Sequence, residues 1–211
     1  MILVFFYVII LVVMAVKKIA IDIDNTICDT SLFYGKLAKD YDRNHLHKKS
    51  NIDYTKVVPR SDDWNDEELF YYLDNIYNKL ALNIPLKEDV SLYINKLKKL
   101  GFEIIFITYR GLKEFDHTDL ITPKYLEINN IPYDDIITGT KNKYEYLKDC
   151  DYFVDDAIRH CEEALENTNC KVIMMSSNIT KGYKNDSFFI ANNWKEVFDY
   201  IKSSEGDVYD N

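Results

Sequence analysis

Short, almost continuously apolar segments recur along this chain, and helical patterns separate them. They are the apolar stretch 19–21 within a predicted strand at 17–24, the segments 102–108, 152–154 and 171–175, and a shorter one at 136–137. Strands buried on both faces of a parallel sheet have this composition, because helices cover the sheet from both sides. The alternation therefore predicts an α/β fold with a parallel sheet and helices on both faces.

Apolar residues spaced about 3.6 positions apart predict the helices between these strands. In chain order they cover residues 85–100, 122–128, 143–150, 157–166 and 194–201. Gly101 follows the first of them and is a typical helix stop. The first four of these helices each lie between two predicted strands, as a parallel sheet requires, and the fifth follows the last predicted strand.

One long segment, residues 27–83, interrupts this alternation. It is polar and aromatic, with helical patterns at 31–41 and 66–82. We therefore expect a helical cap inserted after the first strand. The catalytic core would then comprise residues 17–26 and 84–202, followed by an acidic tail at 203–211.

The first sixteen residues are uninterrupted apolar sequence followed by two lysines. As a helix they would reach roughly 24 Å, less than the roughly 30 Å of a bilayer core. They lack a basic start and a good cleavage site, so a signal peptide is weakly supported. Three interpretations stay open: an uncleaved membrane anchor, a start codon assigned too early with Met14 as the true start, or additional folded structure.

The net charge and the cysteine content limit the kinds of binding partner and cellular compartment that the chain can have. The chain has 35 acidic against 26 basic residues, a formal charge of -9, which disfavours binding to duplex nucleic acid. Its four cysteines show no C-x-x-C spacing, which indicates reduced thiols in a cytoplasmic protein, with membrane anchoring through residues 1–16 as the alternative. A small anionic substrate would need local positive charge or a metal. The sequence leaves the oligomeric state open.

Carboxylates follow two of the predicted strands. Asp22 and Asp24 end the first strand, and Asp155 and Asp156 end a later one. Ligands of parallel α/β sheets bind at the carboxyl ends of the strands, so these side chains should converge there. Four carboxylates would repel one another unless a hard divalent cation neutralised them, and ligation by oxygen alone favours Mg²⁺ over zinc.

Hydrogen-bond donors are expected at the same edge. Thr108 ends the strand at 102–108, and Lys141 and Lys143 precede the helix that leads to the Asp155 strand. With Mg²⁺ bound, these donors could hold a phosphate. Asp22 could then attack phosphorus as a nucleophile, and Asp24 could supply and remove protons, provided that its neighbours raise its pKa.

These residues form an ordered set of motifs. The run from Asp22 to Thr26 resembles the first motif, D-x-D-x-T, of the haloacid dehalogenase-like (HAD) phosphatase superfamily. Ile105–Thr108 resembles the second motif, either lysine matches the third, and Val154-Asp155-Asp156 resembles the fourth. The resemblance covers roughly residues 17 to 200 and implies a Rossmann-like HAD fold.

The resemblance also implies a role for each matched residue. Asp22 is the nucleophile and Asp24 the general acid and base, while Thr108 and a lysine hold the phosphoryl group. Mg²⁺ is bound by Asp22, the backbone carbonyl of Asp24 and a fourth-motif aspartate. We favour Asp156 as that ligand, with Asp155 close by or exchanging roles, and Lys141 over Lys143.

A narrower resemblance is to the 5'(3')-deoxyribonucleotidase group, carried by IDIDNTICDT, ITYR, NIPYDDII and YFVDD. Asn25 and Tyr109 depart from its usual Gly and Ala. It implies a Mg²⁺-dependent phosphomonoesterase that hydrolyses nucleoside monophosphates through an aspartyl phosphate. The alternatives are a phosphatase for another small phosphate or a nucleic-acid 3' end, and a non-catalytic, membrane-tethered HAD-like protein.

Two further expectations concern basic side chains near these motifs. Arg110 is expected to form a structural ion pair rather than a substrate contact. The four histidines lack the mutual spacing of a metal site and are interpreted as surface residues: His45, His47, His117 and His160.

Overall fold

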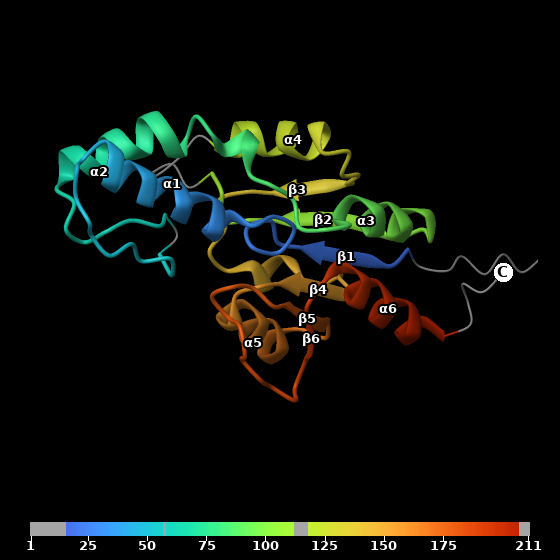
Figure 1. The fold of residues 1–211 in the computed structure, drawn as a ribbon. Helices are drawn as coiled ribbons and strands as arrows, with labels where there is room; N and C mark the ends of the chain where they lie inside the picture. The colour runs from blue at the N-terminus through green and yellow to red at the C-terminus, as the bar shows by residue number, and fades with distance from the viewer. Residues whose placement is uncertain (1–15, 57, 112–117, 207–211) are drawn as a thin grey trace, which may run out of the picture.

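The computed structural model describes residues 16–56, 58–111 and 118–206 (Figure 1). Its centre is a six-stranded sheet in the order β3-β2-β1-β4-β5-β6, with every neighbouring pair parallel. The strands are β1 (Lys18–Ile21), β2 (Glu103–Ile107), β3 (Asp135–Ile137), β4 (Tyr152–Asp155), β5 (Lys171–Met175) and β6 (Phe189–Ala191). The predicted parallel α/β sheet is confirmed.

Strand β1 lies at the point where the strand order reverses. Its Ile21 pairs with Phe106 of β2 on one side and with Val154 of β4 on the other. The chain builds the β1-β2-β3 side first and then crosses to β4, β5 and β6. In open α/β sheets such a switch point is where ligands bind, because the loops diverge there and leave a crevice.

Nine helical segments surround the sheet in the described part of the chain. They are α1 (Thr30–Asn44), α2 (Asp66–Tyr72), the π-helix η1 (Leu73–Tyr77), the 3₁₀ turn η2 (Ala81–Asn83), α3 (Val90–Lys99), α4 (Thr118–Ile128), the 3₁₀ turn η3 (Lys143–Tyr146), α5 (Ile158–Asn167) and α6 (Trp194–Glu205).

Alternate residues of β1 face two separate cores. Ile19 and Ile21 pack with residues of α3 and α6, whereas Ala20 packs with η3 and α5. Successive side chains of a strand point to opposite faces, so both faces of β1 are covered. This accounts for the nearly continuous apolar sequence of the strand, and the expected helices on both faces are confirmed.

The structure differs from the sequence-based expectation at three elements. The helix expected over residues 66–82 is divided into α2, the π-helix η1 and the 3₁₀ turn η2. Instead of a helix over residues 143–150, it has the short 3₁₀ turn η3, followed by a further turn in which Cys150 N–H donates to Leu147 O at 3.0 Å. Strand β6, which has three residues, is absent from the expectation.

Residues 29–85 leave the sheet after β1 and return to the same place. Asp29 N–H donates to Pro85 O at 3.0 Å, Lys87 N–H donates to Ile27 O at 2.9 Å, and Cys28 and Leu86 form an isolated antiparallel bridge. Between these ends, α1 and α2 lie beyond the carboxyl ends of the strands, at the left of Figure 1. This segment therefore sits on the side of the sheet where the motif residues converge.

Large aromatic side chains hold α1 and α2 together. Tyr72 Oη donates to Tyr34 O at 3.0 Å, and Tyr34 Oη donates to Tyr77 O at 2.9 Å. Trp64 Nε1 donates to a carboxylate oxygen of Asp42 at 2.8 Å. All five side chains are buried, so these aromatics act in packing, and Tyr77 also lines the cavity described below.

The apolar residues 1–15 lie outside the described residues, so the three interpretations of that segment stay predictions. Within the residues that the structure does describe, no helix is both long enough and apolar enough to cross a membrane.

Candidate active site

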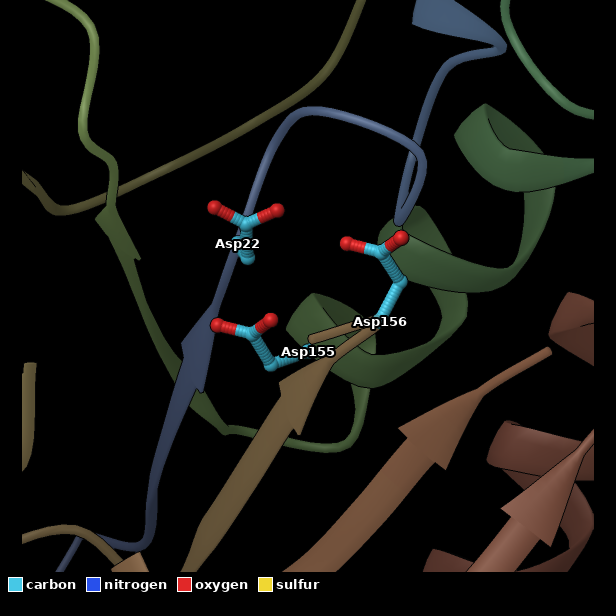
Figure 2. A group of neighbouring side chains, drawn as sticks. All are labelled: Asp22, Asp155 and Asp156. Atoms are coloured by element: carbon cyan, nitrogen blue, oxygen red, sulfur yellow. The ribbon is translucent and has the colours of Figure 1, made fainter. Parts of the chain in front are cut away.

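Three carboxylates meet at the carboxyl ends of β1 and β4. Asp22 directly follows β1, Asp155 ends β4, and Asp22 N–H donates to Val154 O at 2.9 Å, which extends the pairing of the two strands. One oxygen from each of Asp22, Asp155 and Asp156 lies within 4.8 Å of the others. Figure 2 shows the three side chains gathered around one space.

Burial makes this carboxylate cluster unfavourable by itself. Asp22 is 5% exposed, and burial raises its pKa to about 6, with the charges of Asp155 and Asp24 adding to the effect and Lys143 opposing it. Burial and the charges of Asp155 and Asp22 raise the pKa of Asp156 well above its usual range. A divalent cation would offset both effects, so these residues fit a hard metal such as Mg²⁺.

Lys143, rather than Lys141, reaches the cluster. Its Nζ contacts Asp22 Oδ1 and lies 2.7 Å from Asp155 Oδ2, and its side chain is only 2% exposed. Burial opposes its charge, but Asp155 and Asp22 hold the pKa of Lys143 above its ordinary value. Lys143 is the first residue of the 3₁₀ turn η3 and the one residue of that turn that is buried.

Lys141 lines the same cavity as Lys143. It is exposed, and its Nζ is 5.9 Å from the centre of the Tyr109 ring. The structure therefore brings Lys143, and not Lys141, against the carboxylates, while both lysines line the same cavity. The preference for Lys141 as the catalytic lysine stays a prediction.

The adjacent aspartates Asp155 and Asp156 have different surroundings. Asp155 accepts hydrogen bonds from Lys143 Nζ, from the backbone N–H of Ala157 at 2.8 Å and from His160 Nδ1 at 3.1 Å. Although burial acts against it, Lys143 and His160 hold the pKa of Asp155 below its usual value. Among the described residues, neither Lys143 nor His160 donates a hydrogen bond to Asp156, whose side-chain partner is Ser177, so its carboxylate is the freer of the two to bind a metal.

His160 corrects an expectation. It was expected on the surface, but its side chain is only 13% exposed and contacts Asp155. The signal available in the sequence was its place in the first turn of the helix that follows Asp155. His45 is exposed and its ring contacts those of Tyr41 and Tyr71. His47 is exposed and has a φ of 55°, and His117 lies outside the described residues.

Asp24 is clamped by Arg110. Arg110 Nε donates to Asp24 Oδ2 at 2.9 Å, and Arg110 Nη2 donates to Asp24 Oδ1 at 2.6 Å. The hydroxyl of Thr30 also donates to Oδ1, at 2.6 Å. Arg110 therefore makes the expected ion pair, with the paired geometry that a guanidinium fork allows.

The Arg110 ion pair contradicts the expectation that the neighbours of Asp24 raise its pKa. Burial raises the pKa of this carboxyl, but the charge and hydrogen bonds of Arg110 outweigh burial and lower it below its usual range. The neighbours of Asp24 thus favour its ionised form, opposite to the expected direction. The reason is that Arg110, 86 positions away in sequence, is brought against Asp24 by the loop after β2.

The two threonines of the motifs take different places. Thr26 Oγ1 donates to Asp22 Oδ2 at 3.1 Å. Thr108 is fully buried at the end of β2, and its Oγ1 accepts the backbone N–H of Arg110 at 3.2 Å. Asn25 has a φ of 60°, in the left-handed region that Gly and Asn tolerate, which explains why Asn can stand where relatives have Gly.

A cavity of about 620 Å³ opens above the carboxylates. Its floor contains Asp22, Asp24, Lys143, Asp155 and Asp156. Its walls include Thr55, Lys56, Tyr77, Tyr109, Lys141 and Arg159. This volume lies within the range of small-molecule sites, and the residues between β1 and α3 supply part of the wall.

Comparison with protein-family models and with curated proteins found no match. Solved structures do match. A haloacid dehalogenase-like family hydrolase from Streptococcus pneumoniae superposes with a TM-score of 0.62 and 17% identity, over 88% of this chain and 98% of the other. A predicted phosphatase from Clostridium acetobutylicum gives a TM-score of 0.62 and 18% identity, over 89% and 99%.

The chain has the HAD fold. A Bacillus subtilis protein assigned to the HAD hydrolases, determined bound to magnesium, also matches, with a TM-score of 0.59 and 12% identity over 89% of this chain and 99% of the other. Identities this low establish the HAD fold alone, because one fold hosts many functions. The chemistry of this site therefore has to come from its own residues.

Proposed function

We propose that this protein is a Mg²⁺-dependent phosphomonoesterase that hydrolyses nucleoside monophosphates through an aspartyl phosphate on Asp22. The observation that carries the proposal is the placement of Asp22. Its buried carboxylate lies between a lysine ammonium and two further carboxylates, at the floor of a 620 Å³ cavity. A nucleophile, a cation and a metal-binding pair at one point are the parts that phosphoryl transfer needs.

In the first step an oxygen of Asp22 attacks phosphorus in line. The new bond joins phosphorus to the Asp22 oxygen, the bond from phosphorus to the leaving oxygen breaks, and that oxygen takes the proton from the protonated form of Asp24. Arg110 makes this form the minor one at neutral pH, and the proton is restored when Asp24 takes one from water in the second step. Lys143 supports this step, because its ammonium favours the ionised carboxylate of Asp22 and offsets charge on the phosphoryl oxygens. The product alcohol then leaves.

In the second step water attacks the same phosphorus atom. Asp24 takes a proton from this water, the bond between phosphorus and Asp22 breaks, and inorganic phosphate and the Asp22 carboxylate are released. The ionised form that Arg110 favours is the form of Asp24 that this step requires.

Asp22 and Asp156 would hold the metal, with Asp155 beside them. A bound Mg²⁺ would neutralise charge on the phosphoryl group, as a Lewis acid does. The Bacillus subtilis HAD hydrolase bound to magnesium supports the choice of metal. Of the remaining motif residues, Thr108 would support the site by accepting the backbone N–H of Arg110. Lys141 would contact only the part of a substrate that lies at the exposed edge of the cavity.

The preference for a nucleotide rests on the cavity walls and on the resemblance of the motifs to deoxyribonucleotidases. Tyr77 and Tyr109 both line the cavity, and aromatic rings are suited to contact with a base. Tyr77 and Lys56 come from residues 27–83, which supports the role of this segment as a cap over the substrate.

The test is phosphate release from a panel of 5'- and 3'-nucleoside monophosphates and non-nucleotide phosphates, with the full chain, with and without Mg²⁺. We expect Mg²⁺-dependent release that favours nucleotides and that Asp22→Asn abolishes. Release from non-nucleotide phosphates alone would support the proposed mechanism but contradict the proposed nucleotide substrate. A folded protein that binds Mg²⁺ and releases no phosphate would overturn the proposed function.

A further inference from the structure

The carboxylate of Asp24 has one free position for a proton, and its location can be assigned. A carboxylate offers about four lone-pair sites, two on each oxygen. Arg110 Nη2 and Thr30 Oγ1 occupy both sites on Oδ1, and Arg110 Nε occupies one site on Oδ2. Among the described residues no other donor reaches Asp24, so the remaining site is on Oδ2.

The side chain of Arg110 is held rigidly in this position. It is 5% exposed, its guanidinium carbon lies 5.4 Å from the centre of the Tyr125 ring, and its Nη2 is 3.7 Å from the sulfur of Cys28. Its backbone is fixed as well, since its carbonyl accepts the N–H of Gly139 at 2.6 Å. A buried guanidinium with two parallel contacts fixes both the position and the plane of its partner carboxylate.

Asp24 is the exposed member of the pair. Its side chain is 32% exposed and lines the cavity, whereas Arg110 and Thr30 are buried. Arg110 and Thr30 also line this cavity, but each is only 5% exposed. Most of the exposed surface therefore belongs to the carboxylate of Asp24, on the side that Arg110 and Thr30 do not cover.

We propose that Arg110 is a positioning residue: it aims the free lone pair of Asp24 Oδ2 into the cavity, where this oxygen exchanges protons with the leaving group and with water. This inference rests on the proposed function. Arg110 itself need not contact the substrate. Loss of its fork would leave Asp24 free to rotate, and small misplacements of a catalytic group cost about 10²-fold in rate.

The test uses p-nitrophenyl phosphate, whose leaving group departs as a stable anion and needs no proton. Formation of the aspartyl phosphate then does not require Asp24, but its hydrolysis does. In Arg110→Met we expect a burst of nitrophenolate that approaches one equivalent per site, followed by a steady-state rate about 10²-fold below that of the native protein. A role confined to folding would instead lower burst and steady state by the same factor.

Two variants support the interpretation. Arg110→Lys keeps the positive charge but cannot make both contacts of the guanidinium with Asp24. It should give the same burst, with a steady-state rate between those of Arg110→Met and the native protein. If Arg110→Met does not fold, Arg110→Lys replaces it in the test. In Arg110→Ala, millimolar guanidinium ion should raise the steady-state rate severalfold. Arg43→Met, which removes an exposed arginine at the end of α1, is the matched control and should behave as the native protein does.

Each contrary outcome has a distinct meaning. A steady-state rate of Arg110→Met and Arg110→Lys within threefold of the native protein would overturn the positioning role, as would a burst and a steady state that fall together. A native protein that hydrolyses no phosphate with Mg²⁺ would overturn the proposed function, and this inference with it.

Discussion

The indole Nε1 of Trp194 donates a hydrogen bond to the backbone carbonyl of Thr26 across 3.0 Å, joining residues 168 positions apart in the chain. Trp194 is the fully buried first residue of α6, and Thr26 lies in the turn that carries Asp22 and Asp24. Thr26 in turn donates its hydroxyl to Asp22 Oδ2. The last helix of the fold is therefore linked through one residue to the proposed nucleophile.

This link predicts that Trp194→Phe lowers both stability and turnover. The substitution leaves the buried carbonyl of Thr26 without its donor and removes packed volume, so the free energy of unfolding should fall by about 2–4 kcal/mol. Turnover of the folded fraction should fall as the turn loosens. Denaturant titration and phosphate release measure the two effects. Trp64→Phe, which removes the indole contact to Asp42, should destabilise without slowing the folded fraction; equal slowing in both variants would contradict the link.

Lys143→Met should be the more damaging of the two lysine substitutions. It removes the cation shared by Asp22 and Asp155, and losing one partner of a buried ion pair costs about 3–5 kcal/mol of stability. Turnover should fall by about 10²- to 10³-fold, as for other lost charge-stabilising donors. Lys141→Met should lose at least about tenfold less turnover, because that ammonium lies at the rim. Steady-state rates of phosphate release by the two variants are the measurement. A larger loss of turnover in Lys141→Met than in Lys143→Met would favour Lys141 as the catalytic lysine.

Asp156→Asn should make the metal-free protein more stable. The pKa of Asp156 is raised, so its ionised form at neutral pH disfavours the folded state, and a neutral amide of the same shape removes that repulsion. The variant should also lose most of the stabilisation that Mg²⁺ gives. Asp155→Asn should do the opposite to metal-free stability, since the pKa of Asp155 is lowered by partners that it would lose. Thermal unfolding with EDTA and with Mg²⁺ measures both, and a lower metal-free Tm for Asp156→Asn would contradict the assignment.

The stabilisation by Mg²⁺ should grow as pH rises. The pKa of Asp22 is about 6 in the folded protein against 3.8 ordinarily, so between these values the folded metal-free protein binds more protons than the unfolded chain. The contribution of Asp22 to the free energy of unfolding therefore falls as pH rises through this window. Bound Mg²⁺ removes that loss and must displace the protons to bind. Calorimetric scans should give a larger Mg²⁺-induced rise in Tm at about pH 7.5 than at about pH 5; equal rises would exclude Asp22 as a ligand.

The convergence of Asp22 and Asp155 could be predicted from the sequence, because adjacent parallel strands end at one edge of the sheet. The choice between Lys141 and Lys143 could not, since it depends on where a 3₁₀ turn starts. The pairing of Arg110 with Asp24 could be expected as an ion pair with some partner. Its effect on the pKa of Asp24 depends on tertiary packing that local sequence does not encode.

Residues 29–85 leave the core and return to it at one place, where backbone hydrogen bonds hold the two ends of the segment together. None of the strands of the sheet passes through it. An ancestral gene could therefore gain, lose or exchange this stretch as a cassette without altering the register of any strand. Such an exchange would replace Lys56 and Tyr77 in the cavity wall, whereas the strands that carry Asp22 and Asp155 lie outside the stretch. Thr30 at its start would have to be kept, because its hydroxyl donates to Asp24.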